Sequence, residues 1–221
     1  MFIKNYKKTK CFFGCILFND NSDYLYWENR KETDDEIEIV NYLNHFDNLK
    51  YFKILHIGTG NSYIAQNLNG YTGIDGISLS NNEIFLANNL NIENYKCFFL
   101  NKLSEKAFND PQFNKYDLII DVNLKSYSCC NNAFQKMFNN YVKILNDNGL
   151  ILSGKKGMNW SRLLKPVYRF SLKKLIYKRL KEFDGPESNK LTISECKSLA
   201  SNKSLKFEEV EGTNIVKFTK I

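Results

Sequence analysis

The sequence predicts a doubly wound α/β fold with a mostly parallel, seven-stranded sheet and a C-terminal antiparallel hairpin. From residue 52 onward, short apolar runs alternate with segments whose apolar residues recur at helical spacing, which is typical of parallel strands joined by helices. The last two apolar runs, at 205–210 and 215–219, are too close for a helical crossover. They are therefore expected to pair antiparallel.

Length and composition indicate one globular domain with a short extension. The 221 residues are 43% hydrophobic and 25% charged, which is ordinary for a folded protein. No apolar run approaches the roughly 18 residues of a membrane span. The apolar run at 11–18 is short for a signal peptide and lacks a small-x-small cleavage site, so a cytoplasmic location is expected. The six cysteines lack C-x2-C spacing and are expected to be free thiols.

Residues 1–33 are expected to form a hairpin-like extension, and residues 34–221 the domain itself. Two aromatic runs in the extension, at 11–18 and 24–27, flank the turn cluster 19–23, as in a hairpin. Thr33 and Glu36 have the spacing of a capping box, which predicts a helix over residues 34–47.

The body of the domain then alternates strands and helices. Strands are expected where apolar residues run together, at 52–57, 71–74, 95–100, 116–122 and 150–153. Helices are expected at 62–68, 80–91 and 134–145. Ser80 with Glu83, and Thr192 with Glu195, have the spacing of further capping boxes, each opening a helix. Gly149 is expected to supply the left-handed cap after helix 134–145.

The first strand leads into a glycine loop, IGTGNS at 57–62. Glycine lets the backbone turn sharply and lets a ligand approach it closely, and the helix from Ser62 points its N-terminus at an anionic group. Asp75 follows Gly58 by 17 residues and is expected to end the second strand. An acid at that place accepts hydrogen bonds from both hydroxyls of a ribose. The two loops together predict a pocket for an adenosine-type ligand.

On these motifs the sequence resembles the class I S-adenosylmethionine-dependent methyltransferases. The matching pieces follow the family's order from about residue 34 to residue 157, and they lie at 53–65, 71–84, 95–103, 116–128 and 149–157. A dinucleotide site is the weaker alternative, because its fingerprint requires a third glycine where Tyr63 stands.

The resemblance implies S-adenosylmethionine as cofactor, S-adenosylhomocysteine as product, and a set of site residues. The expected cofactor-binding residues are His56, Gly58, Thr59, Gly60, Asn61, Ser62, Asp75, Gly76, Asn101, Lys102 and Asp121. The expected substrate-binding residues are Asn123, Tyr127 and Trp160. Asp121 is the expected general base. His56 and Asn101 stand where the family usually has acids, and His56 is expected to be neutral so that it does not repel the cofactor's ammonium.

The most direct functional hypothesis is methyl transfer to a small molecule through a hydroxyl or an amine, such as a sugar or another metabolite. The DVNL stretch at 121–124 departs from the family's signature for amino-group methylation of bases. The KKGM stretch at 155–158 lacks the Asp-Asn pair of a catechol-type metal site, so no metal is expected.

The basic segment from Arg162 to Lys181 leaves two alternatives open. It contains no acid and holds much of the excess behind the net charge of +7, with apolar residues at helical spacing. Such a helix is the solvated face of a lid, or it binds RNA or another anionic surface. An RNA methyltransferase is therefore one alternative function. A catalytically silent binding module with the same fold is the other.

Overall fold

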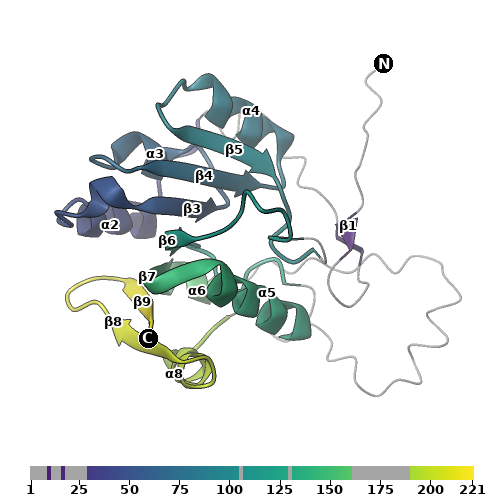
Figure 1. Cartoon of the computed structure of the whole chain (residues 1–221), viewed down its shortest axis with the longest axis vertical. Helices are drawn as coiled ribbons and strands as arrows, with labels where there is room; N and C mark the ends of the chain where they lie inside the picture. Colours follow the sequence, from purple (N-terminus) through teal and green to yellow (C-terminus); the bar gives the residue numbers. More distant parts are fainter. Residues whose placement is uncertain (1–8, 11–15, 18–28, 105–106, 129–130, 161–189) are drawn as a thin grey trace, which may run out of the picture.

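The computed structural model describes residues 9–10, 16–17, 29–104, 107–128, 131–160 and 190–221 (Figure 1). Its strands are β1 (Thr9–Lys10), β2 (Ile16–Leu17), β3 (Lys53–Ile57), β4 (Gly73–Ser78), β5 (Tyr95–Phe99), β6 (Tyr116–Ile120), β7 (Leu145–Gly154), β8 (Leu205–Glu209) and β9 (Ile215–Lys220). Its helices are α2 (Asp34–Leu43), α3 (Tyr63–Asn67), α4 (Asn81–Asn89), α5 (Asn131–Ile144), α6 (Lys155–Asn159) and α8 (Ile193–Ser201), with a short 3-10 turn, η1 (Leu49–Tyr51).

Seven strands form one twisted sheet in the order β5-β4-β3-β6-β7-β9-β8 (Figure 1). The first five of these run parallel, and β9 pairs antiparallel with both β7 and β8. The chain starts in the middle of the sheet at β3, winds outward to β5, and returns to start again at β6. The predicted doubly wound fold with a C-terminal hairpin is confirmed.

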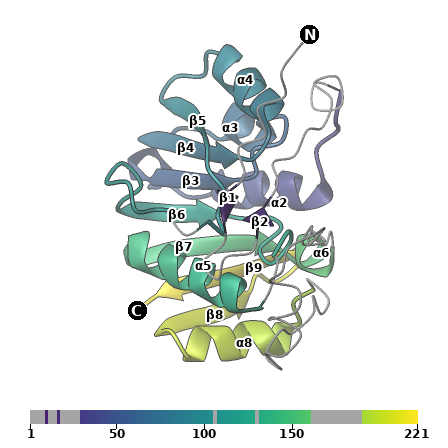
Figure 2. The same cartoon turned by 90° about the vertical axis from the view of Figure 1, so that its right-hand side faces the viewer.

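Helices cover both faces of the sheet and bury two apolar cores (Figure 2). On one face, α5 and α8 pack on the sheet through side chains that include Phe134, Phe138 and Leu199. On the other face, α2, α3 and α4 pack through side chains that include Ile39, Ile64 and Ala87. Both faces of the parallel strands are therefore buried, which explains why those strands appear in the sequence as continuous apolar runs.

Two of the three predicted capping boxes are complete. Thr33 and Thr192 each accept a hydrogen bond from the third helical residue, whose carboxylate accepts one in return. Ser80 also caps its helix, with its hydroxyl accepting from Glu83 N at 3.3 Å. The Glu83 carboxylate does not complete this third box, because it accepts instead from Gly60 N at 3.1 Å.

The junction between α5 and β7 differs from the prediction. Helix α5 ends at Ile144, and β7 begins at the next residue rather than at residue 150. The predicted left-handed cap at Gly149 is wrong, because the left-handed residue is Asn148, with φ +62°. Asn146 donates to Asp117 Oδ1 at 2.7 Å, which ties this segment to β6.

Strand β4 is longer than the sequence suggests, and this changes the site. It was predicted at 71–74 and spans Gly73–Ser78. Its carboxyl half is held on both sides, since Gly58 N donates to Ile77 O at 2.8 Å and Leu100 N donates to Ser78 O at 3.1 Å. Asp75 is consequently an interior strand residue.

In the N-terminal extension, β1 pairs antiparallel with β2, so that Thr9 faces Leu17. The turn cluster 19–23 therefore does not connect these two strands. The predicted run at 24–27 and the basic segment from Arg162 to Lys181 lie outside the described residues. Within the described residues, no helix is long and apolar enough to cross a membrane.

Candidate cofactor pocket

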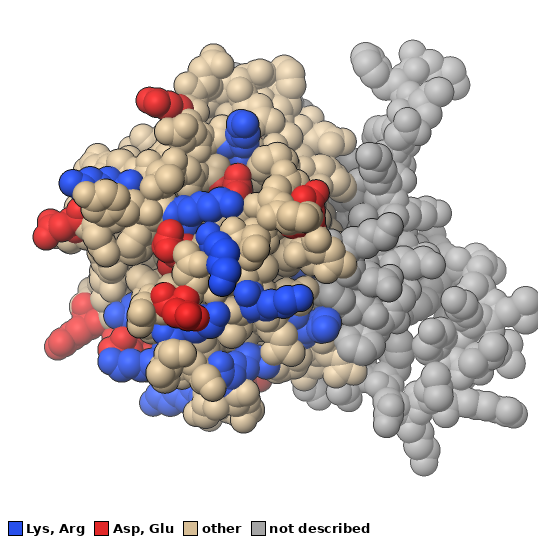
Figure 3. Space-filling model, in the orientation of Figure 1, with Lys and Arg blue, Asp and Glu red and all other residues tan. Residues whose placement is uncertain are grey.

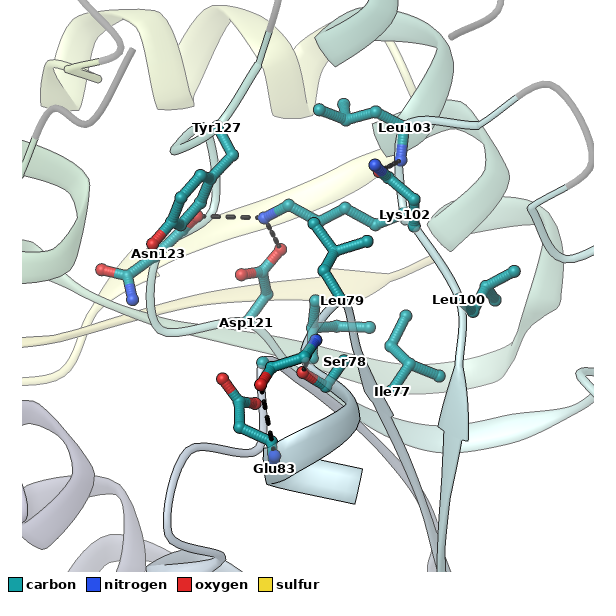
Figure 4. A pocket seen from close by; sticks show the side chains of 14 residues that line it. Ile77, Ser78, Leu79, Glu83, Leu100, Lys102, Leu103, Asp121, Asn123 and Tyr127 are labelled. Carbon is teal, nitrogen blue, oxygen red and sulfur yellow. Dashed lines mark hydrogen bonds and ion pairs between the residues drawn. The ribbon is translucent and has the colours of Figure 1, made fainter. Parts of the chain in front are cut away.

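A pocket opens where β3, β4, β5 and β6 end, at the carboxyl edge of the parallel sheet (Figure 4). Ligands of doubly wound folds bind at this edge, next to the strand where the winding reverses. The residues that line the pocket are Ile57, Gly58, Ile77, Ser78, Leu79, Ser80, Glu83, Leu100, Asn101, Lys102, Leu103, Asp121, Asn123 and Tyr127.

The glycine loop reaches the pocket through Gly58. This residue has φ +71° and open space on the side where a Cβ would stand, so the backbone itself forms the wall there. Ile57 lines the pocket as well, whereas the predicted loop from Thr59 to Ser62 does not. Thr59 and Ser62 are fully buried; Thr59 Oγ1 donates to Glu83 Oε2 at 3.4 Å, and Ser62 Oγ lies 2.9 Å from Tyr95 Oη. These two side chains hold the loop to the sheet and to α4.

The outer side of the same loop is covered by the segment before α2. The Arg30 guanidinium lies beside Gly60, close to where a Cβ would stand, and it donates to both carboxylate oxygens of Glu36 at 3.2 and 3.0 Å. Asn61 Nδ2 donates to Arg30 O at 2.9 Å. Gly60 and Asn61 therefore contact this segment rather than the pocket.

Asp75 does not reach the pocket, and the prediction that it ends a strand at the ligand edge is wrong. Its carboxylate accepts from Tyr116 Oη at 2.7 Å and lies 3.5 Å from Lys53 Nζ. Both partners begin their strands, so Asp75 faces away from the carboxyl edge. Gly76 does not line the pocket either; it allows Thr59 and Tyr95 to pack closely against β4.

Glu83 is the acid of the pocket near the glycine loop, although its spacing from Ser80 predicts only a helix cap. It is 6% exposed, lines the pocket, and accepts from Gly60 N at 3.1 Å. Ser78 and Ser80 lie beside it on the pocket wall, and Ser80 N donates to Ser78 Oγ at 3.0 Å. The sequence did hold a signal for this role, since Glu83 is an acid shortly after the second strand. Its spacing from Ser80 fits a capping box equally well, so the sequence does not distinguish the two roles.

Asn101 brings a buried donor to the pocket wall. Its Oδ1 accepts from Leu103 N at 2.9 Å, which fixes the orientation of the amide. Its Nδ2 is buried and has no partner among the described residues. A buried amide without a partner is costly, which makes Nδ2 a candidate donor to a ligand. The adjacent Leu79, Leu100 and Leu103 supply the apolar walls that a flat base requires.

Lys102 and Asp121 form a buried ion pair across the pocket (Figure 4). Lys102 Nζ donates to Asp121 Oδ2 at 2.7 Å, to Asn123 O at 3.0 Å and to Leu124 O at 3.1 Å, which uses all three N–H groups. Tyr141 Oη donates to the same Oδ2 at 2.9 Å. Asp121 Oδ1 is the oxygen that remains for a ligand.

His56 lies on β3 but does not line the pocket. It is 1% exposed, and neither ring nitrogen has a hydrogen-bond partner among the described residues. Burial lowers the pKa of His56 to about 4, although the negative charges of Glu36 and Asp121 partly oppose this shift. The imidazole is therefore neutral at pH 7, in agreement with the prediction from the sequence.

The predicted substrate residues lie together beside the ion pair. Asn123 and Tyr127 line the pocket, and the Trp160 ring lies 5.6 Å from the Tyr127 ring. Cys97 and Cys196, the cysteines whose surroundings are described, are buried free thiols. Among the described residues, no three His, Cys, Asp or Glu side chains are close enough to hold a metal ion.

The sheet order, the terminal hairpin and the pocket at the carboxyl edge define the class I S-adenosylmethionine-dependent methyltransferase fold. No protein-family model and no curated protein matches the sequence, so the likeness is one of structure.

Three solved structures illustrate this likeness. The magnesium protoporphyrin IX methyltransferase of Synechocystis, with bound S-adenosylhomocysteine, is 12% identical over 90% of this chain and 93% of that chain, with a TM-score of 0.56. The N-methyltransferase NodS of Bradyrhizobium japonicum is 12% identical over 86% and 98%, with a TM-score of 0.56. A TehB-like methyltransferase of Corynebacterium glutamicum is 14% identical over 89% and 93%, with a TM-score of 0.53.

Proposed function

We propose that this protein is an S-adenosylmethionine-dependent methyltransferase that acts on a hydroxyl or an amine of a small molecule. The observation that carries the proposal is Asn101 Nδ2, which is buried at the carboxyl edge of the sheet and has no hydrogen-bond partner in the described part of the chain. This donor fits a ring nitrogen of the cofactor's adenine. The likeness to solved methyltransferases supports the same function.

The remaining parts of the cofactor are assigned by chemistry along the pocket. Glu83, with Ser78 and Ser80, takes the ribose hydroxyls, which is the role that the sequence predicts for Asp75. Gly58 allows the methionine part to approach the backbone. Asp121 Oδ1 faces the cofactor's amino group or the acceptor.

The residues at the reactive end act mainly by alignment, which supplies much of the rate in transfer between two bound reactants. When bound, S-adenosylmethionine supplies an electrophilic methyl group on a sulfonium. Lys102 and Tyr141 hold the Asp121 carboxylate in one orientation through Oδ2. Asp121 Oδ1 can then accept the proton of an acceptor hydroxyl or amine, so we keep Asp121 as the proposed general base.

Substitution of Glu83 and of Asp75 tests the assignment of the ribose. Glu83→Gln should weaken S-adenosylhomocysteine binding by about tenfold or more, because a charged acceptor of the hydroxyl hydrogen bonds is lost. The glutamine oxygen can still accept from Gly60 N, so the loop is retained. The matched control, Asp75→Asn, should change the affinity by less than about twofold, since Asp75 bonds Tyr116 outside the pocket. Both are measured by calorimetry with S-adenosylmethionine and S-adenosylhomocysteine.

The wild-type titration in the same experiment decides between enzyme and binding module. Micromolar binding of either compound supports the proposed enzyme. Failure of both to bind near millimolar concentration would contradict it and favour a silent module. Loss of binding in Asp75→Asn but not in Glu83→Gln would return the ribose role to Asp75.

The charges on one face of the molecule bear on the choice between a small-molecule acceptor and RNA. On the face shown in Figure 3, basic and acidic side chains are interspersed, whereas nucleic-acid surfaces concentrate one sign of charge. The basic segment from Arg162 to Lys181 lies outside the described residues. A cytoplasmic location stays a prediction.

A further inference from the structure

Two aromatic side chains meet at the reactive end of the pocket. Tyr127 follows β6 and lines the pocket, and Trp160 follows α6. Their ring centroids are 5.6 Å apart with an interplanar angle of 64°, an edge-to-face contact. Asp121 and Asn123, which also line the pocket, lie in the same loop as Tyr127. Aromatic faces and polar groups therefore stand together where the acceptor must approach.

The surrounding structure holds this pair in place at some conformational cost. Tyr127 has φ +64°, which a bulky side chain adopts only when neighbouring contacts enforce it. Ser126 Oγ donates to Trp160 O at 3.0 Å, and Trp160 N donates to Gly157 O. Gly157 packs so closely on Val122 that a Cβ would lie 1.9 Å from the Val122 carbonyl oxygen. The loops after β6 and β7 are thereby locked together.

Core packing does not explain Trp160. Its side chain is 42% exposed, whereas the core aromatics Phe134 and Phe138 are 2% exposed or less. A tryptophan placed only for stability would bury most of its large apolar surface. Trp160 is not one of the residues that line the pocket, but it keeps apolar area open while its ring contacts Tyr127, which does line it. An open apolar surface so close to a pocket is typical of residues that contact a ligand.

We propose that Tyr127 and Trp160 form an acceptor-binding wall, and that the acceptor is a planar aromatic compound carrying the hydroxyl or amine that is methylated. This inference rests on the proposed function and narrows its substrate class. A flat ring gains stacking or edge-to-face contact with both side chains, and its polar substituent then lies toward Asp121 and Asn123. A saturated ring with the same substituents cannot make the aromatic contacts.

A matched pair of probes tests the inference directly. Catechol and trans-1,2-cyclohexanediol carry the same two hydroxyls on a planar and a saturated ring, and methyl α-glucoside represents a sugar. Each is titrated by calorimetry with and without saturating S-adenosylhomocysteine. The sequence has two tryptophans, so Trp27→Phe leaves Trp160 as the sole tryptophan fluorophore. We expect catechol to bind about fivefold or more tighter than the other two probes and to quench Trp160 fluorescence saturably.

Three substitutions assign the effect to the two rings. Trp160→Ala and Tyr127→Gly should each weaken catechol about three- to tenfold, and glycine at 127 also removes the backbone strain, so the fold is retained. Tyr127→Phe keeps the ring and should bind catechol like the wild type. Equal affinity for catechol and cyclohexanediol, or unchanged catechol binding in both ring-deletion variants, would overturn the inference. Because S-adenosylhomocysteine binding is measured separately, these results leave the proposed methyltransferase function standing.

Discussion

Lys102→Met should lower the free energy of unfolding by about 3–5 kcal/mol, the usual cost of removing one partner from a buried ion pair. The side chains of Lys102 and Asp121 are 10% and 2% exposed, so the carboxylate is poorly solvated once the ammonium is removed. Among the described residues, the substitution leaves Tyr141 as the remaining donor to the buried carboxylate. It also removes the ammonium from the carbonyl oxygens of Asn123 and Leu124. Urea denaturation monitored by circular dichroism measures the loss.

A surface lysine and a double variant give this prediction its controls. Lys206 pairs with Glu208 at 2.9 Å, but its side chain is 63% exposed, so Lys206→Met should cost less than about 1 kcal/mol. Adding Asp121→Asn to Lys102→Met removes the uncompensated charge and should recover a large part of the loss. A cost below about 1 kcal/mol for Lys102→Met alone would contradict the buried, three-contact geometry.

Acidification should destabilise the wild type more than a His56→Leu variant, by up to about 3 kcal/mol at pH 4. Burial lowers the pKa of His56 to about 4, whereas an unfolded histidine titrates near its ordinary value of about 6.5. Between about pH 6.5 and pH 4, His56 therefore binds a proton in the unfolded chain but not in the folded chain. The stability contributed by the neutral imidazole is complete above about pH 6.5 and is lost as the pH falls toward 4.

The difference in unfolding free energy between the wild type and His56→Leu separates the effect of the histidine from that of other titrating groups. The pKa of Asp35 is raised by burial, and its protonation favours the folded state on acidification, but it does so in both proteins. Leucine also removes two buried ring nitrogens that lack partners among the described residues, so the variant should not be less stable at pH 7 by more than its packing cost. Parallel pH dependences of the two unfolding free energies would refute the role given to His56.

The architecture could be predicted because its signals are local. The apolar runs of β3 and β6 and the complete capping boxes at Thr33 and Thr192 depend on neighbours within a few residues. The sharp turn at Gly58 could likewise be predicted from the sequence, because a positive φ restricts the residue type to glycine in most cases. These features led to the correct sheet, the correct winding and the correct edge for the pocket.

The lining of the pocket was decided by contacts between segments far apart in the chain. Asp75 was expected at a strand end, but hydrogen bonds from β3 and from the segment after β5 extend β4 beyond it to Ser78. The Glu83 carboxylate does not complete the capping box with Ser80, because it accepts a hydrogen bond from Gly60 N instead. Asp121, which follows β6, pairs with Lys102, which follows β5, because the parallel sheet brings the carboxyl ends of its strands to one edge.

The sequence by itself therefore determined the order of strands and helices and the edge of the sheet at which the pocket opens. The tertiary structure alone decided that Glu83 and not Asp75 lines the pocket, which cation neutralises Asp121, and that the rings of Tyr127 and Trp160 are in contact. The physical reason is the range of the interactions. Helical and strand periodicity is set by adjacent residues, whereas hydrogen bonds and ion pairs in a pocket form between groups that only the folded sheet brings within reach.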